Sequence, residues 1–188
     1  MHPVGVRAGG FHLAPNIEQV STLLKKLHAG LPEAEALVRW TASLDLPVHE
    51  QNFTSVALRH PQEYPLNEGH LVSSQGLDIS IDQFETKFSE HQVPHSTALH
   101  CLLDSKPYLV GPIARLNLNL DRLPASVRAL VDSLEVRFPS RNMYHGVIAR
   151  AIEIVFAVQE AIRLLENYRE PPAPYSSVSP RAGTGFGW

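Results

Sequence analysis

The feature that most constrains the fold is a long, nearly uncharged segment late in the 188-residue chain. Residues 143–168 predict one helix of about 39 Å, at 1.5 Å per residue. Between Val147 and Val158, only Arg150 and Glu153 carry charge. A helix that is apolar on most sides is either buried or packed against partner helices. We therefore expect a helical core that contains this segment.

Two shorter helices are expected near the start of the chain. Apolar residues from Ile17 to Leu27 recur at steps of three and four, which predicts a helix with one buried face. Gly30 is expected to end this helix, because glycine is common just past a helix C-terminus. Pro32 is typical of a first helical turn and is expected to begin the second helix. The two helices would then form a helical hairpin.

Short strands and two short helices are expected elsewhere. A Gly9-Gly10 turn and a Gln75-Gly76 turn each predict a tight connection next to a strand. Asp82 is expected to cap a short helix that carries Phe84 and Phe88 four residues apart, and residues 121–134 predict another helix. The candidate strands are residues 3–13, 54–59, 71–74, 77–80 and 108–111. These elements predict an α+β fold, mainly helical, with a long buried helix and short strands.

The domain organisation is expected to be simple. The length suits one domain, and a hydrophobic content of 44% supplies enough apolar surface for a core. We expect a single α+β domain over residues 1–170. Residues 171–188 are rich in proline and glycine, which predicts an extended C-terminal segment.

Charge and composition exclude several classes of partner. The chain has 16 Lys and Arg and 19 Asp and Glu, for a net charge of -3. Nucleic-acid binding needs clustered cations, so no nucleic-acid partner is expected. No apolar run reaches the roughly 20 residues of a membrane span, so no membrane partner is expected either. The single cysteine, Cys101, fits a reducing cytoplasm.

The densest group of possible metal ligands extends from His91 to Cys101 and includes His95 and His100. Three imidazoles and a thiol are suitable ligands for zinc or nickel. Pro94, however, disfavours a helix that would bring His91 and His95 to one face, and no CxxC or HExxH motif is present. We favour hydrogen-bonded histidines at a buried turn, with a metal site as the alternative.

Other candidate groups are weaker. Cys101 as a nucleophile would need a positioned base, and a small buried residue is the more common role for a lone cysteine. Arg115 and Arg141 lie at expected element boundaries. We favour a solvated or structural role for both, with binding of a carboxylate through two hydrogen bonds as the alternative. The glycines of residues 183–187 lack the features of a phosphate loop or a dinucleotide fingerprint. Capping and solvation explain a small acidic group: Asp78, Asp82 and Glu85.

Several phrases together resemble a known family. They are Gly69-His70-Leu71-Val72-Ser73-Ser74-Gln75-Gly76-Leu77-Asp78-Ile79, Val93-Pro94-His95-Ser96-Thr97-Ala98-Leu99-His100, Tyr108-Leu109-Val110-Gly111-Pro112-Ile113-Ala114-Arg115-Leu116-Asn117-Leu118-Asn119 and Pro180-Arg181-Ala182-Gly183-Thr184-Gly185. In this order, and with the opening His2-Pro3-Val4, they resemble the large, catalytic subunit of nickel–iron hydrogenases of the cytoplasmic, soluble type. The resemblance covers essentially the whole chain.

The resemblance implies a parent reaction, the reversible oxidation of H2 to protons and electrons at a nickel–iron centre. In the family this centre is held by two CxxC pairs, and neither pair is present in these 188 residues. We therefore expect an internal scaffold segment of such a subunit. By itself it would bind no metal or cofactor, contain no catalytic residue and be inactive.

The resemblance also implies positions and partners. It places His2 on the side that faces the small iron–sulfur subunit, and His95 and Arg181 behind the metal site. The implied partners are that small subunit or the rest of the large subunit, with a homo-oligomer as a further option. An alternative is a non-catalytic docking or assembly protein derived from this fold. The quinone-site subunit of respiratory complex I shares the fold ancestry but fits residues 108–119 less well.

Overall fold

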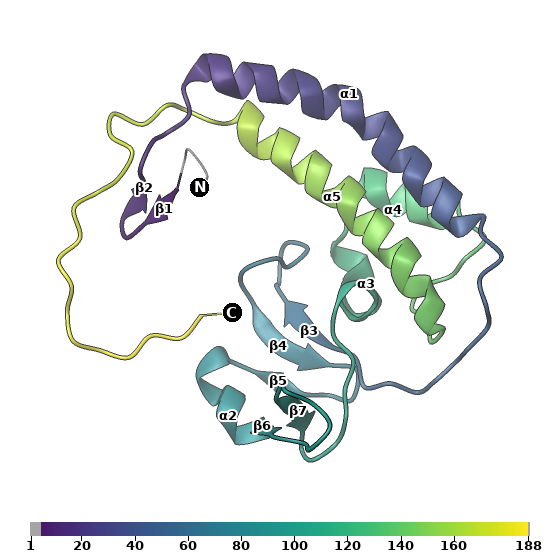
Figure 1. Cartoon of the computed structure of the whole chain (residues 1–188). Coiled ribbons are helices and arrows are strands. Elements are labelled where there is room, and N and C mark those ends of the chain that lie inside the picture. Colours follow the sequence, from purple (N-terminus) through teal and green to yellow (C-terminus); the bar gives the residue numbers. More distant parts are fainter. Residues whose placement is uncertain (1–4, 188) are drawn as a thin grey trace. The chain divides into compact units, whose positions relative to one another are not determined.

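The computed structural model describes residues 5–187 (Figure 1). Within them, α-helices alternate with short strands, which confirms the expected α+β class. The described chain forms two compact units, treated separately below. The first contains the residues up to Ala34 and Ala157–Gly185, and the second contains Glu35–Phe156 with residues 186–187. The expected boundary at residue 170 stays a prediction.

The first unit holds a small hairpin and parts of the two longest helices. Strands β1 (Val6–Arg7) and β2 (Gly10–Phe11) pair antiparallel, as the glycine turn predicts. The unit also contains the first part of α1 (Ile17–Ala42) and the last part of α5 (Gly146–Glu166). Val20 on α1 and Ile162 on α5 are buried, while Leu13 and Leu23 are exposed.

Part of the proline-rich segment is ordered against this hairpin. The backbone N–H of Phe11 donates to the carbonyl oxygen of Pro174 at 2.9 Å, and that of Ser176 donates to Gly9 at 3.0 Å. Glycine is required at position 9, because its φ is +87° and a Cβ there would overlap the Ser176 carbonyl oxygen. Residues 174–176 of the C-terminal segment are therefore held by backbone pairing with this hairpin.

The predicted break at Gly30 is wrong, because α1 runs without interruption from Ile17 to Ala42. Gly30 does not take the positive φ that ends a helix with a glycine cap. Pro32 lies inside the helix, where a missing N–H costs about 3 kcal/mol. Apolar burial continues past it, since Ala34 and Val38 are both buried. That burial offsets the proline and keeps one continuous helix.

The sheet of the second unit follows the predicted turn. Gly76 adopts a φ of +90° in the turn that joins the predicted hairpin, and three strands pair antiparallel in the order β3-β4-β5. A separate antiparallel hairpin pairs β6 with β7. The strands are β3 (Val56–Arg59), β4 (His70–Ser73), β5 (Asp78–Ile79), β6 (Phe88–His91) and β7 (His100–Leu103). Of the candidate strand at 108–111, Leu109 alone pairs, forming a parallel bridge with Ser55.

An aromatic and aliphatic cluster joins this sheet to the β6–β7 hairpin. Val56, Leu71, Phe88 and Leu103 are its buried members. The ring of Phe84 stacks on Phe88 at 4.4 Å between centroids. The predicted short helix is present, but it carries only Phe84, because Phe88 begins β6. The helix α2 (Phe84–Lys87) is correspondingly short.

The predicted capping role of Asp82 is wrong. Ser80 occupies the N-cap position of the 3-10 turn Ile81–Gln83, and the side-chain oxygen of Gln83 accepts from the Ser80 backbone N–H at 3.3 Å. Asp82 instead lies in the first turn and accepts a hydrogen bond from the Ser80 hydroxyl.

The helical part of the second unit differs from the prediction at two prolines. Pro112 opens the unpredicted helix α3 (Pro112–Asn119), where its missing N–H costs nothing. The helix expected over 121–134 begins later, as α4 (Ala125–Asp132), because Pro124 takes the N-cap position. A 3-10 turn, Leu120–Arg122, lies between them.

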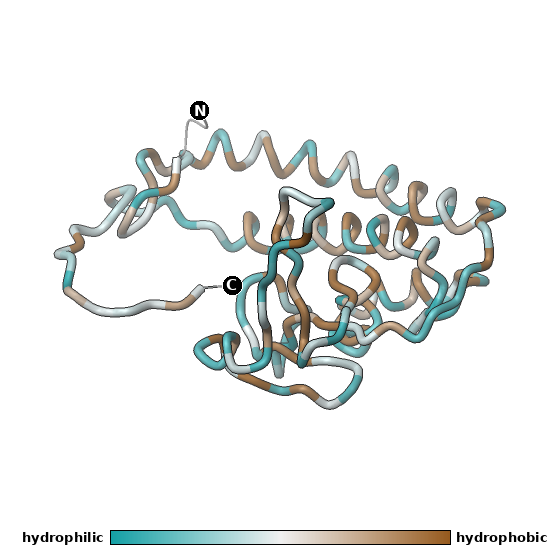
Figure 2. The backbone as a smooth tube through the Cα atoms, turned by 60° about the horizontal axis from the view of Figure 1, so that its bottom comes forward, coloured by the Kyte–Doolittle hydropathy of each residue, from teal (hydrophilic) through white to brown (hydrophobic). Residues whose placement is uncertain are grey.

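The long helix is confirmed, although it starts with a 3-10 turn, Met143–His145, before α5 begins. Within the second unit its inner face is buried. Hydrophobic stretches recur along the long helices of the backbone tube (Figure 2). The core of this part combines fully buried side chains from several helices: Val38, Leu116, Val127, Ile148, Ile152 and Val155. None of the helices in the described chain combines the length and apolar character needed to cross a membrane.

Candidate functional site

A closed polar network lies inside the second unit. The guanidinium of Arg115 on α3 donates two hydrogen bonds to the carboxylate of Glu153 on α5, both at 2.7 Å. The hydroxyl of Tyr64, from the loop between β3 and β4, donates to the same carboxylate at 2.7 Å. The Tyr64 ring packs against Phe156 with centroids 4.9 Å apart. The favoured interpretation of Arg115 as a solvated or structural residue holds in its structural form, because the carboxylate that it pairs with is internal.

The electrostatics of this network oppose acid–base chemistry. Burial, followed by the charge of Glu153, raises the pKa of the Tyr64 phenol far above its ordinary value. The hydrogen bond with Glu153 is the largest cause that raises the pKa of Arg115. Both groups thus keep their protons at neutral pH. The network joins a loop and two helices by charge-assisted hydrogen bonds, which suits a structural role.

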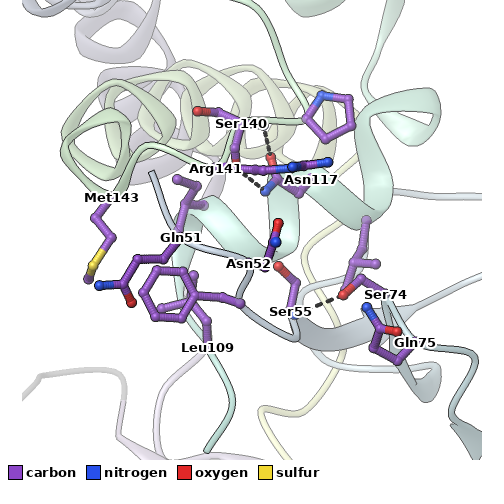
Figure 3. A pocket seen from close by; sticks show the side chains of 14 residues that line it. Gln51, Asn52, Ser55, Ser74, Gln75, Leu109, Asn117, Ser140, Arg141 and Met143 are labelled. Carbon is purple, nitrogen blue, oxygen red and sulfur yellow. Dashed lines mark hydrogen bonds between the residues drawn. The ribbon is translucent and has the colours of Figure 1, made fainter. Parts of the chain in front are cut away.

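An open polar pocket lies elsewhere in the same unit (Figure 3). Its volume is about 540 Å³, and its walls come from residues 51–55, 74–75, 109–118 and 139–143. Its polar lining residues carry amide, hydroxyl and guanidinium groups and include Gln51, Asn52, Gln75, Asn117, Ser140 and Arg141. Its apolar lining residues include Phe53, Leu109 and Ile113. The pocket falls in the 300–1,000 Å³ range of small-molecule sites.

Two asparagines fix the segment that borders the pocket. The side chain of Asn117 on α3 pairs with both backbone groups of Ser140, at 2.8 Å each (Figure 3). Asn142 is buried, and its amide donates to the carbonyl of Pro47 at 3.0 Å. Its side-chain oxygen accepts from the backbone of His49 at 3.3 Å. Residues 140–142 are therefore held from both sides.

The histidine-rich run forms the β6–β7 hairpin and its loop. His91 and His100 face each other across the two strands, with ring centroids 5.9 Å apart, and His95 lies 5.7 Å from His100. All three are exposed, so the predicted buried turn is wrong. His91 and His100 lie on the two strands of the hairpin and His95 lies in its loop, where the three rings face solvent. Among residues 5–187, no three His, Cys, Asp or Glu side chains are placed to hold a metal ion.

Cys101 lies on β7 and is half-buried. Its neighbour Tyr108 has a raised pKa, caused first by burial and then by a hydrogen bond with Cys101. A phenol that keeps its proton is not a base, so this contact does not activate the thiol. The acidic residues Asp78 and Asp82 have local partners, the imidazole of His70 and the hydroxyl of Ser80.

The residues assigned by family resemblance are distributed as follows. His95 lies in the exposed loop between β6 and β7, and Arg181 lies in the exposed segment after α5. His2 is outside the described residues. The roles of all three, facing a partner subunit or lying behind a metal site, stay predictions.

Sequence reasoning missed Glu153, Tyr64 and the two asparagines. Glu153 carried a signal, because it is one of two charges in an otherwise apolar stretch of helix and therefore needs a partner. Tyr64 and Asn142 carried none, since their partners lie far away in the sequence. Asn119, on the same helix as Asn117, is also buried and donates to the carbonyl of Leu58 at 2.9 Å.

Comparison with known proteins identifies a distant relation. The chain is 25% identical over 193 aligned positions to the sulfhydrogenase 1 subunit alpha of Pyrococcus furiosus. The match covers 98% of this chain and 44% of that protein, so the chain spans less than half the length of this relative. No family model matches the chain. The chain is thus distantly related to a hydrogenase subunit.

Proposed function

We propose that this chain forms a scaffold portion of a nickel–iron hydrogenase large subunit, whose parent reaction is the reversible oxidation of H2. The observation that carries this proposal is the similarity to a sulfhydrogenase alpha subunit over 98% of the chain. Similarity over nearly all of the chain favours shared ancestry of the whole segment over a shared local motif. The small iron–sulfur subunit and the rest of the large subunit are the proposed partners.

The residues of the chain do not by themselves fit a nickel–iron centre. Nickel and low-valent iron favour soft thiolate ligands, and the sequence contains one cysteine. That cysteine lies on a strand in contact with Tyr108, without further ligands grouped around it among residues 5–187. We therefore assign no metal-binding step to this chain. Its proposed contribution is a rigid framework, supported by the Arg115–Glu153 pair between α3 and α5.

Metal analysis and an activity assay test the proposal directly. The purified chain is expected to contain no stoichiometric nickel and to show no H2-dependent dye reduction. Stoichiometric nickel together with activity would contradict the scaffold role. The DNA on both sides of the reading frame gives the positive test. We expect segments that encode the two CxxC pairs, one upstream and one downstream, and their absence would count against a hydrogenase large subunit.

A second candidate function is subunit docking without catalysis. The observation that favours it is exposed apolar surface on α5, where Val147 is 42% and Ile154 is 41% exposed. These residues are seven apart and share one helix face, and such patches mark interaction sites. Light scattering of the wild type and of Ile154→Lys tests this function. Docking predicts an oligomer that the lysine dissociates, whereas a monomeric wild type that captures neither proposed partner subunit would contradict it.

A further inference from the structure

Arg141 combines a fixed backbone with a side chain that has no partner among residues 5–187. Its carbonyl oxygen accepts from the backbone N–H of Gln51 at 3.2 Å. Its neighbours Ser140 and Asn142 are held by the contacts to Asn117 and Pro47 described above. In the described part of the chain, by contrast, the Arg141 guanidinium has neither a hydrogen bond nor an ion pair. The backbone geometry thus presents a free cation from a rigid position.

The described lining of the pocket around this guanidinium carries no carboxylate. Among the described residues that line the pocket, none is Asp or Glu. The polar groups near Arg141 are neutral, and Figure 3 shows Asn117 next to its side chain. Most other arginines are already engaged, as Arg59 is by the carboxylate of Asp121 at 2.8 Å. A planar guanidinium without an internal carboxylate is suited to bind an external oxyanion through two hydrogen bonds.

The lining of the pocket also contains apolar side chains. Phe53, Leu109 and Ile113 are among them, and the volume of about 540 Å³ exceeds the needs of a bare ion. Apolar side chains together with a few polar groups are the usual composition of a small-molecule site. The pocket therefore matches a ligand with one anionic group and an apolar body.

We propose that this pocket binds a small molecule through an oxyanion, a phosphate or carboxylate group, that pairs with the guanidinium of Arg141. The side chain of Asn52 also lines the pocket, and the apolar body of the ligand would contact Phe53 and Leu109. The geometry of the pocket carries this proposal, which does not rest on the relation to hydrogenases.

NMR titration of the isotope-labelled full chain at low ionic strength tests the proposal. The probes are inorganic phosphate, succinate and phenyl phosphate. We expect saturable shifts of the backbone amides of Gln51, Arg141 and Ser74. Whichever of phosphate and succinate binds more tightly identifies the preferred oxyanion. Phenyl phosphate is expected to bind more tightly than phosphate, because its ring adds apolar contact.

Three variants make the test specific. Arg141→Gln removes the charge and should weaken binding about tenfold, the loss expected for a charge-assisted hydrogen bond. Arg141→Lys keeps the charge but lacks the planar guanidinium. Its affinity for the probes should lie between those of the wild type and Arg141→Gln. Arg150→Gln is the matched control, because Arg150 is an exposed arginine on α5 outside the pocket. Its affinity for the probes should equal that of the wild type.

Several results would overturn the proposal. One is the absence of saturable shifts at the pocket with all three probes. Another is equal affinity of Arg141→Gln and the wild type. Equal weakening by Arg150→Gln would show general attraction to positive charge instead of a site. Arg141 is exposed, so both of its variants should retain the fold, and their circular dichroism spectra check this.

Discussion

Arg115 and Arg141 belong to the same unit but lie in opposite chemical environments. Arg115 forms a bidentate pair with Glu153, and Tyr64 completes the coordination of that carboxylate. At Arg141 the backbone is hydrogen-bonded and the guanidinium is free within the described chain. The difference separates two uses of one residue type. A guanidinium that is paired with an internal carboxylate holds elements of the fold together, whereas one on a fixed backbone without such a carboxylate is available to a ligand.

The largest loss in the free energy of unfolding is expected from Glu153→Ala, which tests the network of Arg115, Glu153 and Tyr64. It leaves Arg115 and Tyr64 without their acceptor in a place where the Glu153 side chain is 13% exposed. Breaking a buried pair costs about 3–5 kcal/mol, and we expect about 2–3 kcal/mol because the Arg115 side chain is 35% exposed. Urea unfolding measures the change.

Glu160→Ala is the matched control for this variant. Glu160 lies on the same helix and pairs with Arg163 three residues on, near the surface. An exposed pair of this kind contributes at most about 0.5 kcal/mol. Equal destabilisation by the two variants would show that the Arg115 network has no special structural weight.

Asn142→Ala tests how firmly the backbone of residues 140–142, which borders the pocket at Arg141, is held. The change removes the donor to Pro47 and the acceptor for the backbone of His49 and Tyr144, all at a buried position. Buried donors left unsatisfied predict a loss of about 2 kcal/mol in the free energy of unfolding. Hydrogen exchange of the Gln51 amide, which donates to Arg141, should accelerate as the segment loosens.

Asn167→Ala is the control for the buried asparagine. Asn167 is exposed and donates one hydrogen bond to the carbonyl of Arg163 at 2.8 Å. Its loss should stay within about 0.5 kcal/mol, as for most surface substitutions. Unchanged exchange at Gln51 in Asn142→Ala would mean that Arg141 is positioned by other contacts.

Tyr64→Phe returns to the closed network with a smaller change. The ring keeps its packing on Phe156, while one hydrogen bond to a charged acceptor is lost. The expected cost is about 1.5 kcal/mol. Tyr168→Phe is the comparison, because its hydroxyl donates to a neutral carbonyl, that of Pro15, at 2.7 Å. That variant should lose about 0.5–1 kcal/mol, and a larger loss than in Tyr64→Phe would contradict the ranking.

The sequence predicted those parts of the fold that depend on local signals. The Gln75-Gly76 turn and the long helix after residue 143 follow from glycine chemistry and from apolar content within one segment. The prediction of a helix break at Gly30 was wrong, because burial of Ala34 and Val38 outweighs the local cost of Pro32. Helix propensity is a weak prior that tertiary packing overrides.

The two polar sites were predictable to different degrees. A structural role for Arg115 was part of the favoured interpretation of the sequence, but its partner Glu153 depends on how α3 meets α5. The pocket could not be predicted, because its walls come from segments far apart in the sequence. Arg141 was singled out, yet its free side chain is evident only once its neighbours are placed.

The smallest effect concerns pH and the wall of the open pocket. His145 is hydrogen-bonded to the Ser140 hydroxyl at 2.7 Å, and burial lowers the pKa of its imidazole below the ordinary 6.5, against an opposing effect of Glu50. At pH values near and somewhat below this ordinary pKa, the imidazole of the unfolded chain therefore binds more protons than that of the folded chain. Stability from the neutral imidazole is complete above the unfolded pKa and is lost as pH falls through it.

His145→Asn isolates the contribution of the neutral imidazole to stability. The side-chain oxygen of the asparagine can take the place of Nδ1 as acceptor, and it does not titrate. Between about pH 7 and pH 5, the wild type should lose more stability than the variant. Parallel urea-midpoint curves for the two proteins would contradict the assignment. A protonated ring would still contact Ser140, next to Arg141, and would add positive charge to the pocket wall. If the pocket binds an oxyanion, phosphate affinity in the wild type should therefore rise on acidification more than in His145→Asn.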